Sequence, residues 1–307
     1  MDAIEVIEPK VTVYMNTRNR AGLIGRALDS LRNQTFTDFE VLVLDAGSTD
    51  NTQAVVEKYT IFDNRIKYIG FGNEKLATCL NYVISKAKGK YITQLDDDDE
   101  YFPEKISLQV QLLDSSPEKV GVVYCWEEFW DDKKNETLYL NKPNVRGDAY
   151  LKLLERSCVG GGTTMMMRKS AFDFVGGLDE SIQLGADYQL NINLSKHFHH
   201  DFVPKVLVRT HINHQYGRLS EMKVEIMRYE DIIEMVEKIL LDHQEAFNDY
   251  PHLRIGHFRS IMHSAAKIRN FSKFFKYLRK GLYIRNPLRI KILYFLRGMK
   301  HLLFAKR

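Results

Sequence analysis

Apolar runs and a helical spacing alternate at the start of the chain. Residues 11–15 (VTVYM) and 41–44 (VLVL) are short apolar runs that end in polar turn residues, which predicts two buried strands. Between them, Ile24 and Leu28 recur at helical spacing, and Arg26 falls on the other side of the predicted helix. The order strand, helix, strand is therefore expected here.

The same alternation continues to about residue 100. We expect helices near residues 54–59 and 76–86, and strands at residues 65–69 and 91–95. Such short alternating units are typical of an α/β fold, a Rossmann-like, mostly parallel sheet with helices on both faces. Ligands of these sheets bind beyond the carboxyl ends of the strands, so the residues just after each strand are the candidates for a site.

The pattern changes near residue 218. Apolar residues then recur every three or four positions through residues 222–240, 271–282 and 288–302, which predicts long amphipathic helices. We therefore expect a helical C-terminal region at residues 218–307, after an α/β domain at residues 1–217.

Composition excludes several classes of protein. The chain has 307 residues, 44% of them apolar and 27% charged, which excludes a disordered or collagen-like chain. Its three cysteines contain no CxxC pair, so we expect neither a disulfide framework nor the usual zinc site. The first ten residues are acidic, and no apolar run reaches about 18 residues. A cytoplasmic protein is the expectation.

Positive charge gathers at the C-terminus. Residues 250–307 contain 15 Lys and Arg and no Asp or Glu, whereas the whole chain has a net charge of only +4. The predicted C-terminal helices are therefore suited to an anionic partner, either a membrane surface or nucleic acid. We expect no nucleic acid, because no recognisable nucleic-acid module is present. The alternative is that the apolar stripes pack on the first domain while the charges are only solvated.

A run of acidic residues follows the predicted strand at residues 91–95. Asp96 and Asp98 are two positions apart, so on an extended chain both side chains point the same way. Two carboxylates about 4 Å apart repel by roughly 4 kcal/mol at an effective dielectric near 20, so the pair favours a cation or protons. Mg²⁺ or Mn²⁺, which prefer oxygen ligands and bridge to phosphates, would suit it. A solvated acidic loop is the alternative.

Three segments carry a resemblance to a known family. They are VTVYMNTRNRAGLIGRALDSLRNQTFTDFEVLVLDAGSTDNT, AKGKYITQLDDDDEYFPEKI and VGGLDESIQLGADYQL. In this order they resemble the family 2 glycosyltransferases, which are inverting enzymes of the GT-A fold. The resemblance implies a nucleotide-binding half at about residues 1–100 and an acceptor-binding half at about 101–217.

The resemblance also implies roles for individual residues near the donor. Asp96 and Asp98 match the Asp-x-Asp motif that holds a divalent metal on the donor diphosphate, with Asp98 in direct contact and Asp96 near the metal or the ribose. Thr17, Asn19 and Asp45 resemble residues that line the nucleoside pocket. The alternative for these three is ordinary turn and capping chemistry.

Three departures from the family pattern affect the donor side. Ala46 replaces an acid that often meets the uracil ring, and Asn16 replaces the usual proline. Leu80 replaces an arginine sometimes aimed at the diphosphate, and Lys75 is the candidate substitute.

On the acceptor side, Asp187 in the block Gly-Ala-Asp matches the catalytic base of the family. A carboxylate within about 3 Å of the attacking hydroxyl can accept its proton. An acid that stabilises a helix N-terminus is the alternative. His211 resembles a histidine that approaches the metal, or else it is a buried, hydrogen-bonded histidine. Trp126, Phe129 and Trp130 could stack on a sugar or pack in the core.

The function implied is transfer of a sugar from a nucleotide-diphosphate donor, with UDP-sugar preferred, to a hydroxyl of a growing cell-envelope glycan or lipid-linked oligosaccharide. Such an enzyme would work in the cytoplasm, as a peripheral protein on the inner face of the membrane. Ala46 and Ala186 both stand where the family pattern has an acidic residue, which leaves one alternative, a non-catalytic nucleotide-sugar-binding or scaffold subunit. The helical region could also pair protomers into a homo-oligomer.

Overall fold

A computed structural model describes residues 8–72, 75–182, 184–214, 216, 226–284 and 296. The chain forms two compact units. Unit 1 comprises Met1–Ala149, Cys158–Glu180 and Leu190–Ser220, and unit 2 comprises Tyr150–Ser157, Ser181–Gln189 and Glu221–Arg307. Two short segments before residue 217 thus group with the C-terminal residues. The predicted division at 217/218 stays a prediction.

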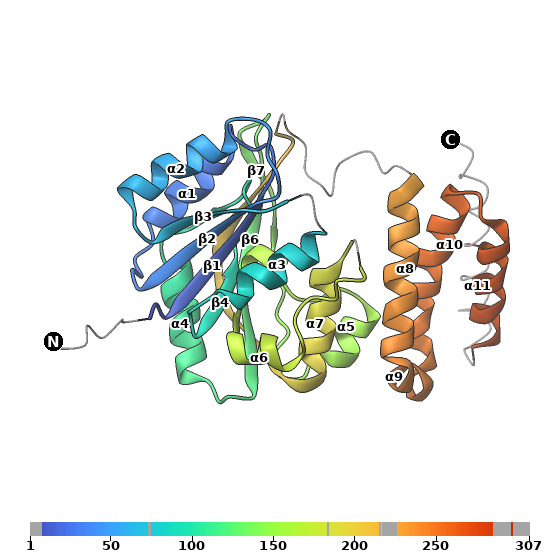
Figure 1. Ribbon diagram of the computed structural model, residues 1–307. Coiled ribbons are helices and arrows are strands. Elements are labelled where there is room, and N and C mark those ends of the chain that lie inside the picture. Colours follow the sequence, from blue (N-terminus) through green and yellow to red (C-terminus); the bar gives the residue numbers. More distant parts are fainter. Residues whose placement is uncertain are drawn as a thin grey trace. The chain divides into compact units, whose positions relative to one another are not determined.

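The strands of the described residues form a nine-stranded sheet in unit 1 (Figure 1). Their order is β3-β2-β1-β4-β8-β6-β9-β5, and β7 pairs with β6. The bounds are β1 (Val11–Thr17), β2 (Phe39–Asp45), β3 (Ile66–Gly70), β4 (Tyr91–Gln94), β5 (Glu100–Tyr101), β6 (Val120–Asp131), β7 (Glu136–Asn141), β8 (Met166–Arg168) and β9 (His199–Ile212).

The first half of the sheet is parallel, as its alternating pattern predicts. β1 pairs in parallel with β2 and β4, and β2 pairs in parallel with β3. Every residue of β2 is buried, which is expected for a strand covered on both faces. The covering helices are α1 (Ile24–Arg32), α2 (Thr52–Phe62), α3 (Leu76–Ser85) and α4 (Lys105–Ser115). This arrangement brings the carboxyl ends of β1, β2 and β4 to one edge of the sheet.

The second half of the sheet mixes directions. β8 is antiparallel to both β4 and β6, whereas the long strands β6 and β9 are parallel. The short β5 and the hairpin strand β7 add antiparallel pairs at β9 and β6. Strand and helix alternation did not predict these strands, because their pairing joins segments far apart in the sequence.

Three helical elements lie between the later strands along the chain, one before β8 and two between β8 and β9. They are η1 (Gly162–Thr164), α6 (Lys169–Phe174) and α7 (Ala186–His197). Residues 188–194 alternate apolar and polar positions as a strand would, yet they are helical in α7. Leu190, Ile192 and Leu194 are all buried, so this helix is covered on more than one side and its alternating pattern does not require a strand. Only the first turn of α7 belongs to unit 2.

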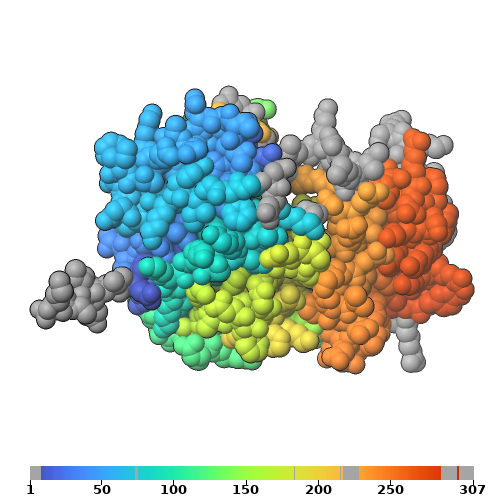
Figure 2. Space-filling model, in the orientation of Figure 1, coloured from blue at the N-terminus to red at the C-terminus, as the bar shows by residue number. Residues whose placement is uncertain are grey.

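Unit 2 is helical, as its spacing predicts. Its helices are α5 (Tyr150–Glu155), α8 (Ile226–Asp242), α9 (Gln244–Asp249), η2 (Pro251–Leu253), α10 (Arg254–Lys267) and α11 (Phe271–Tyr283). α10 packs against both α8 and α11, which are orange to red in Figures 1 and 2. Ile261, Met262 and Phe274 are among the residues of the apolar core that these helices share.

Two predictions about the C-terminal region have separate outcomes. The helix predicted at residues 271–282 is α11, and the described part of the one at 222–240 lies in α8. The helix predicted at residues 288–302 lies outside the described residues except for Leu296. Within the described part of the chain, no helix is both long enough and apolar enough to span a bilayer.

Candidate functional site

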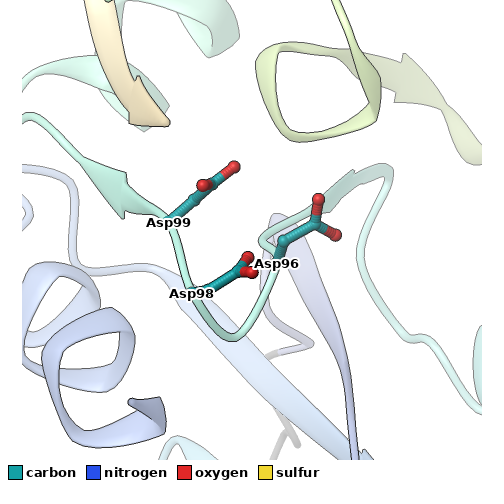
Figure 3. A group of neighbouring side chains, drawn as sticks. All are labelled: Asp96, Asp98 and Asp99. Atoms are coloured by element: carbon teal, nitrogen blue, oxygen red, sulfur yellow. The ribbon is translucent and has the colours of Figure 1, made fainter. Parts of the chain in front are cut away.

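Three carboxylates meet in the turn between β4 and β5. Asp96, Asp98 and Asp99 each offer an oxygen, and these oxygens lie within 4.8 Å of one another (Figure 3). The turn is closed by a hydrogen bond of 3.1 Å from the backbone N–H of Asp99 to the carbonyl of Asp96. The structure therefore brings the predicted pair together and adds Asp99, which the sequence reasoning missed.

The remaining acid of the run has a different neighbourhood. Asp97 is only 8% exposed, and one of its carboxylate oxygens is 3.8 Å from Nε of Arg20. Burial raises the pKa of Asp97 to about 7. Repulsion from Asp98 and Asp96 acts in the same direction, whereas the Thr17 hydroxyl and Arg20 oppose it. Asp97 thus connects the acidic turn to the residues that follow β1.

Two histidines near the turn have distinct partners. Nε2 of His214 lies 3.2 Å from a carboxylate oxygen of Asp98, and both side chains are buried. His211, the predicted metal-side histidine, instead has Nδ1 2.5 Å from Asp132 and Nε2 3.1 Å from Glu100. The hydrogen bond with His211 holds the pKa of Glu100 below its usual range. His214 was missed, although it follows His211 by only three positions.

Arg26 on α1 is tied to the same turn. Its guanidinium donates to the backbone carbonyl of Asp98 over 2.9 Å and lies 3.3 Å from the carboxylates of Glu100 and Asp132. The helical pattern put Arg26 on the side of its helix away from the apolar residues, and Arg26 is not among the buried residues of α1. Half-buried, Arg26 helps to hold the backbone of the acidic turn and the carboxylates that bind His211.

The predicted nucleoside residues gather at the carboxyl ends of β1 and β2. Asn19 adopts a positive φ of 54°, and its side-chain oxygen accepts from the backbone N–H of Thr49 over 2.8 Å. The two oxygens of Asp45 accept from the backbone N–H of Ser48 at 2.8 Å and from the Tyr68 hydroxyl at 3.0 Å. Burial raises the pKa of Tyr68 to about 12, so this hydroxyl stays a donor.

Thr17 is 1% exposed at the end of β1, and its carbonyl accepts from the backbone N–H of Ala46 over 2.9 Å. Thr17 and Asp45 are also direct partners in the parallel register of the two strands. The three predicted residues therefore lie on neighbouring segments of unit 1, and their roles toward a nucleoside stay predictions.

Lys75 immediately precedes α3, and its Nζ donates to the carbonyl of Glu180 over 3.3 Å. Asn81 on the same helix donates to the carbonyl of Leu178 and to the carboxylate of Glu180, both over 2.9 Å. A Cβ at Gly177, whose φ is +76°, would lie 2.8 Å from the Asn81 side chain. The turn at residues 176–180 is thus fixed against α3.

Asp187 lies in the first turn of α7 and is exposed. It belongs to unit 2, in which the next residue, Tyr188, donates from its hydroxyl to the carbonyl of Leu153 over 2.6 Å. Gln189 donates to Asp242 of α8 over 3.0 Å. The first turn of α7 is therefore anchored within unit 2, and the role of Asp187 as a base stays a prediction.

The sequence pattern of Glycosyl transferase family 2 matches residues 12–176. An uncharacterized glycosyltransferase of Rickettsia prowazekii (strain Madrid E) is 30% identical over 232 residues, which are 74% of this chain and 71% of that protein. The chain therefore belongs to glycosyl transferase family 2, and it is a glycosyltransferase. The chondroitin synthase of Pasteurella multocida (strain Pm70) is 30% identical over 200 residues, which are 61% of this chain and 19% of the synthase.

The fold of this chain matches solved structures of GT-A glycosyltransferases. S. aureus TarS 1–349 in complex with UDP-GlcNAc has a TM-score of 0.62 and 18% identity, over 96% of this chain and 81% of that one. The mannosyltransferase PcManGT from Pyrobaculum calidifontis, in complex with GDP-Man and Mn²⁺, has a TM-score of 0.59 and 18% identity over 98% and 89%. The expected fold class is confirmed.

Proposed function

We propose that this protein is an inverting, metal-dependent transferase that moves a sugar from a nucleoside-diphosphate donor to a hydroxyl of a glycan. The observation that carries the proposal is the meeting of three carboxylates at the carboxyl end of β4. That edge of a parallel sheet is where ligands bind in α/β folds, and a cluster of carboxylates needs a compensating cation.

The side chains around the acidic turn fit a divalent metal. Carboxylate oxygens suit Mg²⁺ and Mn²⁺, and the imidazole of His214 beside Asp98 adds a nitrogen that Mn²⁺ accepts. Asp98, Asp96 and His214 would hold the ion. The carboxylate of Asp99 accepts hydrogen bonds from the Thr210 hydroxyl and from the backbone N–H of His211. A bound ion would neutralise negative charge on the departing diphosphate. Mn²⁺ accompanies GDP-Man in the Pyrobaculum structure, which supports this choice of metal.

The donor would lie along the ends of β1, β2 and β4. Thr17, Asn19 and Asp45 would line the nucleoside, and Lys75 would offer positive charge to the diphosphate. UDP is the preferred nucleotide, and UDP-GlcNAc in the related fold of TarS supports it. His211, with both ring nitrogens on carboxylates, would act by positioning the residues around His214.

The acceptor hydroxyl would be activated by Asp187. In the transfer, the acceptor oxygen bonds to the anomeric carbon, its proton passes to the Asp187 carboxylate, and the bond from that carbon to the diphosphate oxygen breaks. Attack opposite the leaving group inverts the anomeric configuration. The chondroitin synthase relative supports a polymeric glycan as acceptor, and a cell-envelope glycan or lipid-linked oligosaccharide is the proposed class.

We also propose that the enzyme works at the inner face of the membrane, as a peripheral protein. The support is α11, where exposed Phe275 and Tyr283 lie among the exposed cations Lys276, Arg279 and Lys280. Aromatic and basic side chains on one exposed helix face are suited to anionic headgroups. A lipid-linked acceptor would be met at that surface.

Asp98→Asn tests the proposed metal site. The change keeps the shape of the side chain but removes its charge, so we expect Mn²⁺-dependent hydrolysis of UDP-sugars, and transfer from them, to fall by about a hundredfold or more.

Asp187→Asn should retain Mn²⁺ and UDP binding in calorimetry while transfer is lost. NMR of the product should show an inverted anomeric configuration.

Asp29→Asn is the matched control, since Asp29 is an exposed carboxylate of unit 1 with a surface ion pair to Arg32 of 3.6 Å. It should keep the wild-type rate within about twofold, because exposed ion pairs contribute little. Full activity of Asp98→Asn would overturn the proposed metal site, and full activity of Asp187→Asn would overturn the proposed base.

A further inference from the structure

The hairpin formed by β6 and β7 carries a stacked pair of aromatic rings. Phe129 and Tyr139 are paired across the two strands, their ring centroids are 4.4 Å apart, and their planes differ by 14°. Tyr139 is 53% exposed, so much of this large ring contacts solvent. A rigid aromatic surface of this kind is a recurrent feature of binding sites.

The ring pair lies on the same face of the sheet as the acidic turn. Thr210 of β9 is the parallel partner of Phe129, and residues paired across neighbouring strands share a face. The Thr210 hydroxyl is 3.2 Å from a carboxylate oxygen of Asp99 and 3.2 Å from one of Glu127. Glu127 is two positions before Phe129, which puts it on that face as well. The buried side chains of Thr210 and Glu127 therefore connect the carboxylate cluster to the strands that carry the ring pair.

Polar groups adjoin the rings on this face. The side-chain N–H of Asn141, two positions after Tyr139, donates to Glu127 over 2.8 Å. A pyranose ring has a face of C–H groups that can pack on an aromatic ring, and hydroxyls around its edge that bond to carboxylates and amides. An aromatic surface beside a few fixed polar groups matches that chemistry.

We propose that Phe129 and Tyr139 form an acceptor subsite that stacks on a pyranose ring of the glycan. This inference rests on the proposed glycosyl transfer, and it names what the acceptor must present, a pyranose at some distance from the reacting hydroxyl. The aromatic pair would orient the chain of sugars toward the metal-binding turn.

Binding to a glycan array tests the subsite without turnover. Wild type, Tyr139→Ala, Tyr139→Phe and Leu140→Ala would be applied to immobilised pyranose oligosaccharides, including chondroitin and hyaluronan hexasaccharides. We expect wild type to bind at least one of them, Tyr139→Ala to bind it about tenfold more weakly, and Tyr139→Phe to match wild type within about twofold. Leu140, 44% exposed and next to Tyr139 on the other face of β7, is the matched control and should be unaltered.

Three outcomes would overturn the inference: no oligosaccharide bound by wild type, equal binding by Tyr139→Ala, or an effect of Tyr139→Ala only on self-association in sedimentation velocity. UDP binding with Mn²⁺, measured by calorimetry on the same proteins, separates the two proposals. If wild type binds UDP and Tyr139→Ala binds glycan normally, only the subsite fails. If wild type binds and hydrolyses no nucleotide sugar, the proposed transfer itself fails.

Discussion

Lys105, at the first position of α4, is fully buried in unit 1. Its Nζ donates to the Thr93 hydroxyl over 2.5 Å and lies 3.9 Å from the centre of the Tyr101 ring. Burial lowers the pKa of Lys105 to about 7, because a charged ammonium loses its hydration in the core. Thr93 also donates to the carbonyl of Met165, so the lysine belongs to a polar network beneath the acidic turn.

Lys105→Met should remove a pH-dependent part of the stability. A lysine with a pKa of about 7 when folded and about 10.4 when unfolded binds more protons in the unfolded state between these values, so wild type gains stability as the pH rises from 7 to 10. The charge costs the fold roughly 4 kcal/mol at pH 7 by this reasoning. Lys105→Met lacks this rise. The free energy of unfolding of the variant minus that of wild type should therefore decrease as the pH increases from 7 to 10.

Urea unfolding at pH 7, 8, 9 and 10 measures this difference. Lys58→Met, which changes an exposed lysine of α2, is the control and should follow wild type at every pH. A constant difference between Lys105→Met and wild type across this range would contradict the prediction.

At the scale of elements, α11 carries large aromatic side chains on its exposed side as well as on its buried side. Its inner side packs into the core of unit 2 through Phe274 and Leu278, whereas Phe275 is 51% and Tyr283 75% exposed. A groove of about 450 Å³ lies between these exposed rings. The tie to α8 is polar as well as apolar, since Glu237 accepts from the Tyr277 hydroxyl over 2.7 Å. Within the described part of unit 2, these two exposed rings therefore lie outside the apolar core that holds the helix.

The exposed face of α11 should bind anionic vesicles. We expect cosedimentation of the full chain with phosphatidylglycerol vesicles, but not with pure phosphatidylcholine, and a decrease with salt because each Lys or Arg near the surface contributes about 1 kcal/mol. Phe275→Ala combined with Tyr283→Ala should weaken binding by about tenfold or more, because two rings no longer insert.

Phe174→Ala is the control for this experiment, since Phe174 is 65% exposed on α6 of unit 1. Equal partitioning of wild type and the double variant would exclude α11 as the contact surface.

At the scale of the whole molecule, donor and metal should stabilise the fold together. A ligand that binds only the folded state, at a hundred times its Kd, adds about 2.7 kcal/mol, which corresponds to a rise in Tm of about 5–11 °C for a unit of this size. We expect this rise with Mn²⁺ and UDP combined, a smaller one with GDP, and none after addition of EDTA. Calorimetric scans of the full chain test it, and a shift that EDTA leaves intact would argue against a metal-dependent donor site.

Much of unit 1 could be predicted from the sequence, and the reason is local. The strands at β1, β2, β3 and β4 and the helices between them follow from apolar periods of a few residues, which each segment carries by itself. The α7 segment shows the limit of such periods, because its alternation predicts a strand whereas the segment is a helix in which Leu190, Ile192 and Leu194 are all buried.

The sequence by itself determined the parallel α/β half, the helical C-terminal region and the pair Asp96 and Asp98, since these depend on neighbours along the chain. Only the tertiary structure decided that Arg26 holds the Asp98 carbonyl and that His214 meets the Asp98 carboxylate. These contacts join residues 72 and 116 positions apart, and no local spacing encodes them. The His214 contact forms because β9 pairs with β5 and β6 and brings the residues after it to the acidic turn, and the Arg26 contact forms because α1 packs beside β5.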